Sequence, residues 1–259
     1  MIFKKFKTPG IAHVAYLLGD KGEGVLVDPR RDISEYLKAA REDKLTIRYV
    51  LETHRQEDFV IGSSEIAKLT GAKIVTFNHE LFGHSDVRLT EGEDFRVGGL
   101  ILRALHTPGH TPESACYVVY LPDAPKVAWG VFTGDTLFIG EAGRTDLPDP
   151  KKTRENAGIL FDSIQTKLSP LGDQTLIWPA HGSGSVCGGN IAERDESTLG
   201  LERATNPAFT KTRAEFMDAK VDERIPHPPY FSLMEKVNLK GGLPPIKAET
   251  TPDIEGPRT

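Results

Sequence analysis

Short apolar stretches bounded by glycine open the chain and predict a β-hairpin. Residues 13–20 (HVAYLLGD) and 22–29 (GEGVLVDP) are rich in aliphatic side chains, a composition typical of strands. Gly19, Gly22 and Gly24 supply the backbone freedom that the connecting turn needs. The fold is therefore expected to begin with a sheet.

The pattern then changes to helical spacing and back. Between Asp32 and Leu45, apolar side chains recur every three or four positions, which predicts an amphipathic helix. Asp32 and Glu35 are placed as a capping pair at its start. Residues 46–52 (TIRYVLE) return to a strand pattern, so this part of the chain predicts a strand, helix, strand unit.

The same alternation continues to about residue 182. A starting serine and a closing glycine predict a short helix over 63–71, and residues 154–168 carry a longer helical pattern. The remaining predicted strands are 72–77, a pair within 95–109, 114–121, 126–135 and 174–182. Strands that alternate with helices predict an α/β fold in which helices cover the sheets.

Two segments near the C-terminus differ in composition. Residues 191–220 are charged and helical in pattern, whereas residues 241–259 are polar and rich in proline, as in linkers and disordered ends. We therefore expect a single domain over 1–240, followed by a tail or linker over 241–259.

The overall composition argues against several classes of function. The 259 residues carry 32 Lys plus Arg against 37 Asp plus Glu, a net charge of -5, so no positive field holds nucleic acid by its phosphates. No run of about 18 apolar residues predicts a membrane helix, and the N-terminus lacks a signal-peptide pattern. The cysteines, Cys116 and Cys187, cannot form a disulfide framework. We expect a cytoplasmic protein that binds neither nucleic acid nor membranes.

Side chains that can bind metals follow four of the predicted strands. They lie in the segments LETHRQED, RALHTPGHTPES, VFTGDTLF and IWPAHGSG. A lone buried histidine is usually a hydrogen-bonded core residue, and a lone Gly-Asp is usually a turn. Sites on α/β sheets, however, gather at strand ends, so four such segments together favour one metal centre.

The order of these motifs resembles the metallo-β-lactamase superfamily. The matching residues are Thr53, His54 and Asp58 in the first loop, His110 in TPGHTPES, Asp135 in TGDTLF and His181 in PAHG. The resemblance covers roughly residues 11–190 and implies an αββα sandwich, with two sheets face to face, helices outside and a metal at one edge. The superfamily includes thioesterases, lactamases, nucleases and oxygen-using enzymes, so membership alone does not give the reaction.

The first loop departs from the His-x-His-x-Asp-His pattern that binds two zinc ions in hydrolases of this superfamily. Gln56 and Phe59 stand where two histidines are expected. A phenyl ring cannot coordinate a metal, and a carboxamide is a weak neutral ligand compared with imidazole. The resemblance therefore disfavours a two-zinc hydrolase.

The family's ligand positions that remain are His54, His110 and Asp135. Two imidazoles and one carboxylate are the facial triad of mononuclear Fe(II) sites, which leave positions open for substrate and O2. The persulfide dioxygenase branch uses these positions for iron, and the segments GEAGRTDL and HGSGSVCGGNI resemble that branch, including its forms often fused to a rhodanese domain. The resemblance implies one Fe(II) per chain and oxidation of a low-molecular-weight thiol persulfide, such as glutathione persulfide, by O2 to sulfite and thiol.

Gln56, Asp58 and His181 are expected to support catalysis around this metal. Gln56 would hydrogen-bond to iron-bound water or to a ligand. Asp58 either orients His54 or a water molecule, or caps its loop. His181 remains from the second metal position of the family pattern.

Four residues are candidates for substrate binding. Arg144 either holds a carboxylate of a glutathione-like substrate or forms an internal salt bridge to Asp146. Cys187 follows His181 in a loop of small residues and is expected either to be exposed near the metal, as a sulfur relay or regulatory thiol, or to pack in a tight turn. Tyr230 either closes a substrate pocket or packs as an ordinary aromatic residue.

Three functions stay open from the sequence. They are an iron-dependent persulfide dioxygenase, a single-metal thioester hydrolase related to glyoxalase II, and a non-catalytic sulfur-carrier or binding module. No cysteine follows Cys187, so we expect no functional rhodanese domain in this chain and consider a separate rhodanese-type sulfurtransferase as a partner. Members of the family are often dimers or larger, which suggests a homo-oligomer.

Overall fold

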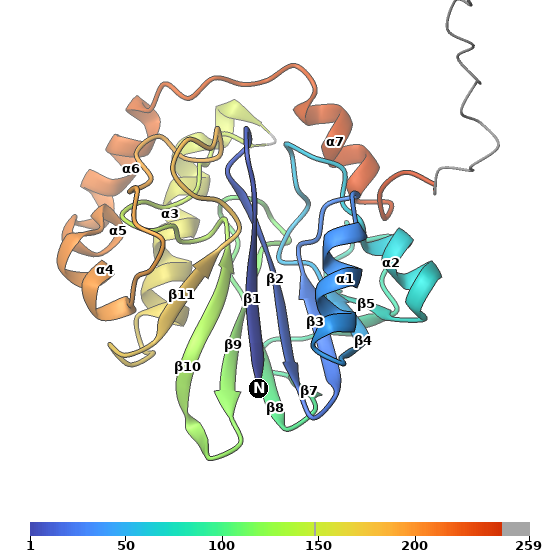
Figure 1. Ribbon diagram of the computed structural model, residues 1–259. Helices are drawn as coiled ribbons and strands as arrows, with labels where there is room; N and C mark the ends of the chain where they lie inside the picture. The colour runs from blue at the N-terminus through green and yellow to red at the C-terminus, as the bar shows by residue number, and fades with distance from the viewer. Residues whose placement is uncertain (148, 245–259) are drawn as a thin grey trace, which may run out of the picture.

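Two β-sheets pack face to face between layers of helices (Figure 1). The computed structural model describes residues 1–147 and 149–244. The first sheet contains β1 (Ile2–Thr8), β2 (His13–Asp20), β3 (Glu23–Val27), β4 (Thr46–Leu51), β5 (Lys73–Phe77) and β6 (Val87–Leu89), in the order of the chain. The second contains β7 (Asp94–Val97), β8 (Leu100–His106), β9 (Ala115–Leu121), β10 (Ala124–Gly134) and β11 (Leu176–Pro179), in the order β11-β10-β9-β8-β7.

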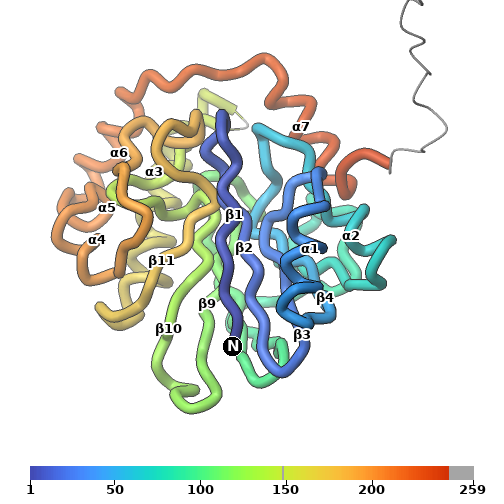
Figure 2. The backbone as a smooth tube through the Cα atoms, viewed as in Figure 1, coloured from blue at the N-terminus to red at the C-terminus, as the bar shows by residue number. Residues whose placement is uncertain are grey.

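Helices cover the outer face of each sheet, which confirms the expected αββα sandwich (Figure 1). The helices are α1 (Ser34–Glu42), α2 (Ser63–Thr70), α3 (Thr153–Ser163), α4 (Leu199–Thr205), α5 (Pro207–Thr210), α6 (Arg213–Asp222) and α7 (Phe231–Asn238). The segment between α6 and α7 spans from the helices over one sheet to the helix beside the other (Figure 2). In the described part of the chain, no helix is long and apolar enough to cross a membrane.

The core between the sheets is aromatic. Phe3, Tyr16, Phe132 and Trp178 pack together there, and the ring centroids of Phe3 and Trp178 are 4.6 Å apart. A second apolar layer fills the space between the first sheet and α1, where Tyr36 is buried. Because both faces of each sheet are covered, most strands are apolar on both sides rather than alternating.

Most predicted elements are confirmed. The segments 13–20 and 22–29 form the antiparallel pair β2 and β3, the helix over 63–71 is α2, and its closing Gly71 adopts a left-handed φ of 73°. The helix over 154–168 is α3, extended by a π-helical turn over Ile164–Leu168.

The predicted capping pair at the start of α1 is wrong. The helix begins after Ile33, and no side chain makes a capping hydrogen bond there. Glu35 instead pairs with Arg30 on the preceding loop. The carboxylate of Glu35 therefore forms an ion pair with Arg30 and does not cap the helix in the way that the local pattern had predicted.

Three elements were not predicted, namely β1, β6 and α7. In β1 the two phenylalanines lie three residues apart and point to opposite faces of the sheet, Phe3 toward Trp178 and Phe6 toward Tyr36. The lysines between them occupy an edge strand, where they discourage pairing with other chains. The predicted tail over 241–259 lies outside the described residues from residue 245 onward.

Candidate metal centre

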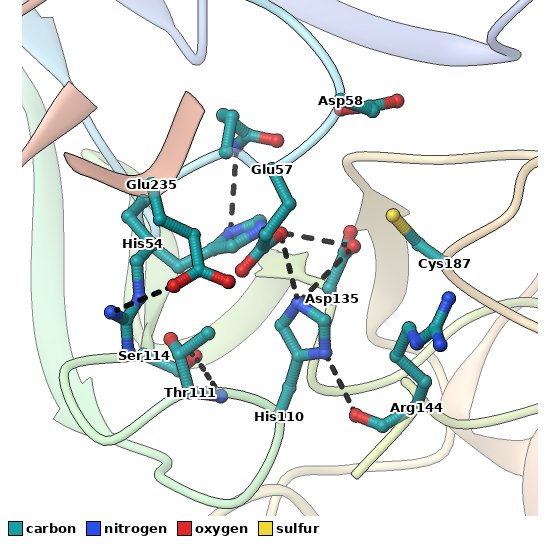
Figure 3. Close-up of polar contacts among 12 residues, drawn as sticks. His54, Glu57, Asp58, His110, Thr111, Ser114, Asp135, Arg144, Cys187 and Glu235 are labelled. Atoms are coloured by element: carbon teal, nitrogen blue, oxygen red, sulfur yellow. Dashed lines mark hydrogen bonds and ion pairs between the residues drawn. The ribbon is translucent and has the colours of Figure 1, made fainter. Parts of the chain in front are cut away.

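The loops that follow β4, β8, β10 and β11 meet at one end of the sandwich and bring the predicted metal-binding residues together (Figure 3). His54, Glu57, His110 and Asp135 each offer a ligand atom, and these atoms all lie within 4.8 Å of one another. The predicted group of His54, His110 and Asp135 is therefore present, with Glu57 added to it.

His54 is oriented by a buried chain of hydrogen bonds. Thr53 donates from its backbone N–H and from its hydroxyl to the carboxylate of Asp28, at 2.8 and 2.7 Å. Since the hydroxyl hydrogen is used in this way, Thr53 Oγ1 accepts from His54 Nδ1, 2.9 Å away. The tautomer is thereby fixed with Nε2 free to bind a metal.

Burial controls the protonation of Asp28 and His54, the two titratable residues in this chain of hydrogen bonds. It lowers the pKa of His54 to about 3, so the imidazole is neutral and able to act as a ligand. Burial also raises the pKa of Asp28 to about 7, although the hydrogen bonds from Thr53 favour the ionised carboxylate.

His110 is held by the tight turn after β8. Gly109 has a φ of 135°, and a Cβ atom at this position would lie 2.5 Å from the backbone of Leu160, so only glycine fits. His110 Nδ1 donates to the backbone oxygen of Arg144 at 2.9 Å, which leaves Nε2 facing the cluster. Burial alone lowers the pKa of His110, but Glu57 and Asp135 beside it raise that pKa to about 9.

Asp135 follows β10 and faces two ways. Its Oδ1 accepts from His181 Nδ1 at 2.8 Å, and its Oδ2 lies 3.7 Å from His54 Nε2 and 3.6 Å from His110 Nε2. Gly134 before it has a φ of 51°, and a Cβ there would come within 2.6 Å of Thr53 Oγ1. A glycine is thus required for β10 to approach the loop of His54.

Glu57 is the member of the cluster that the sequence reasoning missed. Its Oε2 lies 3.5 Å from His110 Nε2 and 3.8 Å from His54 Nε2, and the side chain is fully buried. It occupies a variable position of the His-x-His-x-Asp-His pattern, so the family motif gives it no role. The one available signal was a carboxylate next to Gln56, where a ligand had been lost.

The four side chains fit a metal ion. Among the described residues, the atoms that face one another have no hydrogen-bond partner: His54 Nε2, His110 Nε2, Asp135 Oδ2 and both carboxylate oxygens of Glu57. Each unpaired buried polar atom costs about 1–3 kcal/mol, so their convergence is expensive unless a cation lies among them. Two imidazoles and carboxylate oxygens are the donor set of divalent transition metals.

Asp58, His181 and Cys187 form a second cluster beside the first. His181 Nε2 lies 3.0 Å from Asp58 Oδ2, while Nδ1 contacts Asp135. Burial lowers the pKa of His181, but Asp135 and Asp58 together raise it well above its usual value. Asp58 therefore orients His181 and not His54, which corrects one of the roles expected for it.

Phe59 lies where the family pattern has a ligand for a second metal. Its ring packs against His13, with centroids 4.2 Å apart, and His13 in turn packs edge-on against His181. Phe59 therefore supplies an aromatic packing contact where the family pattern has a metal ligand.

Gln56 lies on the Nδ1 side of His54. Its Nε2 is 3.5 Å from His54 Nδ1, and its backbone oxygen accepts from Asn238 of α7 at 2.6 Å. Asn238 also donates to the backbone oxygen of Phe59 and accepts from the backbone N–H of Ile61. Helix α7 is thus hydrogen-bonded to the loop that carries His54. The expected hydrogen bond from Gln56 to iron-bound water stays a prediction.

Arg144 forms the internal salt bridge that was the alternative to substrate binding. Its guanidinium contacts both oxygens of Asp146 at 2.7 Å and donates to the backbone oxygens of Val186 and Pro226 at 2.9 Å. The side chain is buried and ties three loops together beside His110. A direct contact of Arg144 or Asp146 with substrate stays a prediction.

Cys187 is close to the metal cluster but not exposed. Its side chain is fully buried with Phe138 and Ile191, so the expected exposure is wrong and the packed alternative is correct. Burial raises the pKa of the thiol well above its usual value. Tyr230, in contrast, is 42% exposed at the start of α7, and its role at a substrate pocket stays a prediction.

A cavity of about 380 Å³ opens beside His181. Lys5, Lys7 and Arg194 line it together with Tyr16. The lysines are paired with carboxylates of the loop at 195–196. Glu193 and Asp195 also line the cavity, so charged side chains of both signs lie beside His181.

Comparison with known families gives the same picture. The profile described as "Metallo-beta-lactamase superfamily" matches residues 8–181. The chain belongs to this superfamily. The superfamily match contains His54, His110, Asp135 and His181, which are the residues that the structure brings together.

Two curated relatives in the superfamily have different activities. The chain is 27% identical to the mitochondrial persulfide dioxygenase ETHE1 of Mus musculus, over 94% of this chain and 89% of that protein. It is 29% identical to the hydroxyacylglutathione hydrolase GloC of Haemophilus influenzae, over 73% of this chain and 88% of that protein. The superfamily and a metal-dependent enzyme are thus supported, while the reaction has to be argued from the site.

Two solved structures are similar over almost the whole chain. A metallo-beta-lactamase from Staphylococcus aureus superposes with a TM-score of 0.85 at 34% identity, covering 93% of this chain and 72% of that one. ETHE1 from Myxococcus xanthus superposes with a TM-score of 0.80 at 29% identity, covering 92% of this chain and 98% of that one. The fold, including the helices after residue 190, is therefore shared with these proteins.

Proposed function

We propose that this protein is a mononuclear iron-dependent persulfide dioxygenase. The observation that carries the proposal is the asymmetry of the site: unpaired ligand atoms converge at His54, His110 and Asp135, while Phe59 stands in place of a ligand of the second position. The similarity to persulfide dioxygenases over most of the chain supports the same reaction. Two-zinc hydrolysis needs the position that this chain has lost.

His54, His110 and Asp135 would hold one Fe(II) at the bottom of the site. The iron would supply electron transfer between the persulfide sulfur and O2, which the side chains themselves cannot provide. The overall reaction balances as RSSH + O2 + H2O giving RSH and sulfurous acid, which ionises to sulfite. Four electrons pass from sulfur to O2, and the sulfur–sulfur bond is broken.

The surrounding residues restrict how Asp135 can bind. Because His181 Nδ1 occupies Asp135 Oδ1 at 2.8 Å, only Oδ2 faces the two imidazoles. Asp58 holds the other side of His181. His181, held by Asp58, would thus limit Asp135 to binding the metal through one oxygen. Coordination positions would then stay open for substrate and O2.

The cavity beside His181 supports an anionic thiol as the carrier of the persulfide. Lys5, Lys7 and Arg194 line it. Lys5 and Lys7 pair with Glu196 and Asp195 on the exposed loop, and exposed pairs of this kind contribute little to stability. The carboxylates of a glutathione-like molecule could therefore replace the pairs of Lys5 and Lys7 at small cost.

A single-metal thioester hydrolase is the second candidate, because the chain is also similar to a hydroxyacylglutathione hydrolase. The two reactions differ in their need for oxygen. A hydrolase releases thiol from an acyl-glutathione without oxygen, whereas a persulfide dioxygenase consumes O2 and produces sulfite.

The decisive experiment is oxygen uptake by anaerobically purified protein. We expect about one iron per chain, and O2 consumption with sulfite formation when glutathione persulfide is added. Lactoylglutathione serves as the control substrate and should release no thiol. Two tightly bound zinc ions per chain, or hydrolysis of the control without O2 uptake, would refute the proposal. His54→Ala should abolish the activity, whereas a non-catalytic sulfur carrier would be unaffected.

The cellular setting remains part of the proposal. A cytoplasmic location, a homo-oligomeric state and a separate rhodanese-type sulfurtransferase as a source of persulfide sulfur are expectations from sequence. Size measurement in solution and persulfide transfer assays would test the last two.

A further inference from the structure

We propose that Glu57 is a fourth protein ligand, so that the metal is held by two imidazoles and two carboxylates. The inference rests on the metal centre of the proposed function and specifies its ligand set. In the His-x-His-x-Asp-His pattern the second histidine stands at Gln56. Here the neighbouring residue, Glu57, would supply the missing ligand with a carboxylate.

Distances among the four side chains support a shared ion. Two ligands that each lie about 2.1 Å from one metal are about 3.0 Å apart at a right angle and about 3.4 Å apart at a tetrahedral angle. His110 Nε2 lies 3.5 Å from Glu57 Oε2 and 3.6 Å from Asp135 Oδ2, and His54 Nε2 lies 3.8 and 3.7 Å from the same two atoms. Glu57 is thus as near to both imidazoles as Asp135 is (Figure 3).

The same distances argue against a proton shared between Glu57 and His110. A hydrogen bond between nitrogen and a carboxylate oxygen brings the two atoms to about 2.7–2.9 Å. All four nitrogen–oxygen distances in the cluster are longer than this and nearly equal. An ion at the centre accounts for this arrangement, whereas a proton would shorten one contact and leave the others long.

Glu57 also lacks another partner. Its side chain is fully buried, and neither of its carboxylate oxygens has a hydrogen-bond partner among the described residues. The adjacent cation, Arg55, is directed elsewhere: its guanidinium contacts Glu113 at 3.0 Å and Glu235 at 3.5 Å. A buried carboxylate with no such partner is retained where it binds a metal.

A fourth ligand changes what the centre can do. Two carboxylates neutralise a divalent ion, and of six coordination positions two remain, enough for a sulfur ligand and O2. The harder oxygen donor also favours iron or manganese over zinc, relative to the imidazole it replaces. The centre would then differ from a facial triad in charge and in the number of open positions.

Metal binding by Glu57→Gln tests the proposal without any substrate. The change removes the charge and keeps the shape of the side chain. Glu113→Gln is the matched control, because Glu113 is an equally buried carboxylate of the same region that pairs with Arg55 and lies outside the cluster. Apo proteins would be titrated with Co(II), followed by its visible absorption, and with Fe(II) under anaerobic conditions in competition with a chelator.

We expect E57Q to bind Fe(II) at least about 10-fold more weakly than wild type, since even residues that only support ligands have effects of that size. Its Co(II) spectrum should change in band position and intensity, because the ligand set changes, and E113Q should keep the wild-type spectrum. Wild-type affinity in E57Q would overturn the proposal. So would weaker binding with an unchanged Co(II) spectrum, which would place Glu57 outside the coordination sphere.

Thermal unfolding separates a ligand from a structural role. In the absence of metal, E57Q should melt close to the wild-type temperature, since the change removes the cost of burying a carboxylate together with its contact to His110. The increase in melting temperature on adding metal should be smaller than in wild type. Equal increases in both proteins would contradict the proposal. Failure of wild type to consume O2 with persulfide would instead refute the proposed function and leave these binding results intact.

Discussion

Replacement of Thr53 by valine tests whether the buried chain from Asp28 to His54 controls the metal centre. Valine has nearly the same shape but lacks the hydroxyl, so two hydrogen bonds are lost, at 2.7 Å to Asp28 Oδ2 and at 2.9 Å to His54 Nδ1. The backbone N–H of residue 53 still donates to Asp28 at 2.8 Å. The change is therefore confined to the hydroxyl.

The expected cost follows from burial. A hydrogen bond to a charged group contributes about 1.5–3 kcal/mol and a neutral one about 1 kcal/mol. Asp28, Thr53 and His54 are each about 1% exposed, so water cannot replace the lost partner. We expect T53V to lower the free energy of unfolding of the apo protein by about 3 kcal/mol. Metal affinity should fall by about 10- to 100-fold, because the imidazole is no longer fixed in one tautomer.

Urea unfolding of the apo protein and chelator competition measure the two effects. Thr53→Ser is the control, since it keeps the hydroxyl and loses only a methyl group. T53S should therefore keep metal affinity close to wild type. If T53V bound metal as tightly as T53S, the hydroxyl would not orient His54 and the reasoning would fail.

Four further predictions follow from the same contacts. Gly134→Ala should destabilise the protein by about 1–3 kcal/mol in thermal unfolding, because its Cβ would lie 2.6 Å from Thr53 Oγ1 at a positive φ. Asn238→Ala should weaken metal binding in chelator competition and increase hydrogen exchange in the loop over 56–61, since three of its hydrogen bonds hold that loop to α7. Phe59→His should raise the metal content of protein reconstituted with excess zinc from one to two ions per chain by metal analysis, because it restores the missing ligand of the second position. The pKa of Asp28 is about 7 in the folded protein against an ordinary 3.8. The apo protein should therefore lose up to about 4 kcal/mol of stability as pH rises from about 4 to 7. Asp28→Asn should remove this pH dependence in urea unfolding.

The fold and the convergence of three residues of the cluster could be predicted because they depend on strand ends. His54, His110 and Asp135 each follow an apolar strand at a fixed place in a short loop, and the sandwich brings those ends together. The helical spacing of apolar residues predicted α2 and α3 equally well, because their apolar positions face a sheet.

Side-chain direction in irregular backbone could not be predicted. Glu57 lies in a loop without a repeating geometry, so nothing in the sequence showed that it turns toward His110 while Gln56 turns toward His54 Nδ1. The contacts of Asn238 join residues about 180 positions apart, beyond the reach of any local pattern. The loop of small residues left it open whether Cys187 is exposed or packed, and Phe138 from a distant loop covers it.

In the proposed one-metal centre, a protonated His181 would balance the charges of Asp58 and Asp135. In the hydrolase pattern, a second zinc compensates the charges of the aspartates matching Asp58 and Asp135. Here His181 lies between those carboxylates, 3.0 Å from one and 2.8 Å from the other, and they raise its pKa well above its usual value. A protonated imidazole donates to Asp135 and to Asp58 and supplies one positive charge. This charge would replace part of the charge that a second metal ion supplies in the hydrolase pattern. In the proposed one-metal centre, both nitrogens of His181 would then carry hydrogen and leave no lone pair for a second metal, in agreement with the loss of a ligand at Phe59.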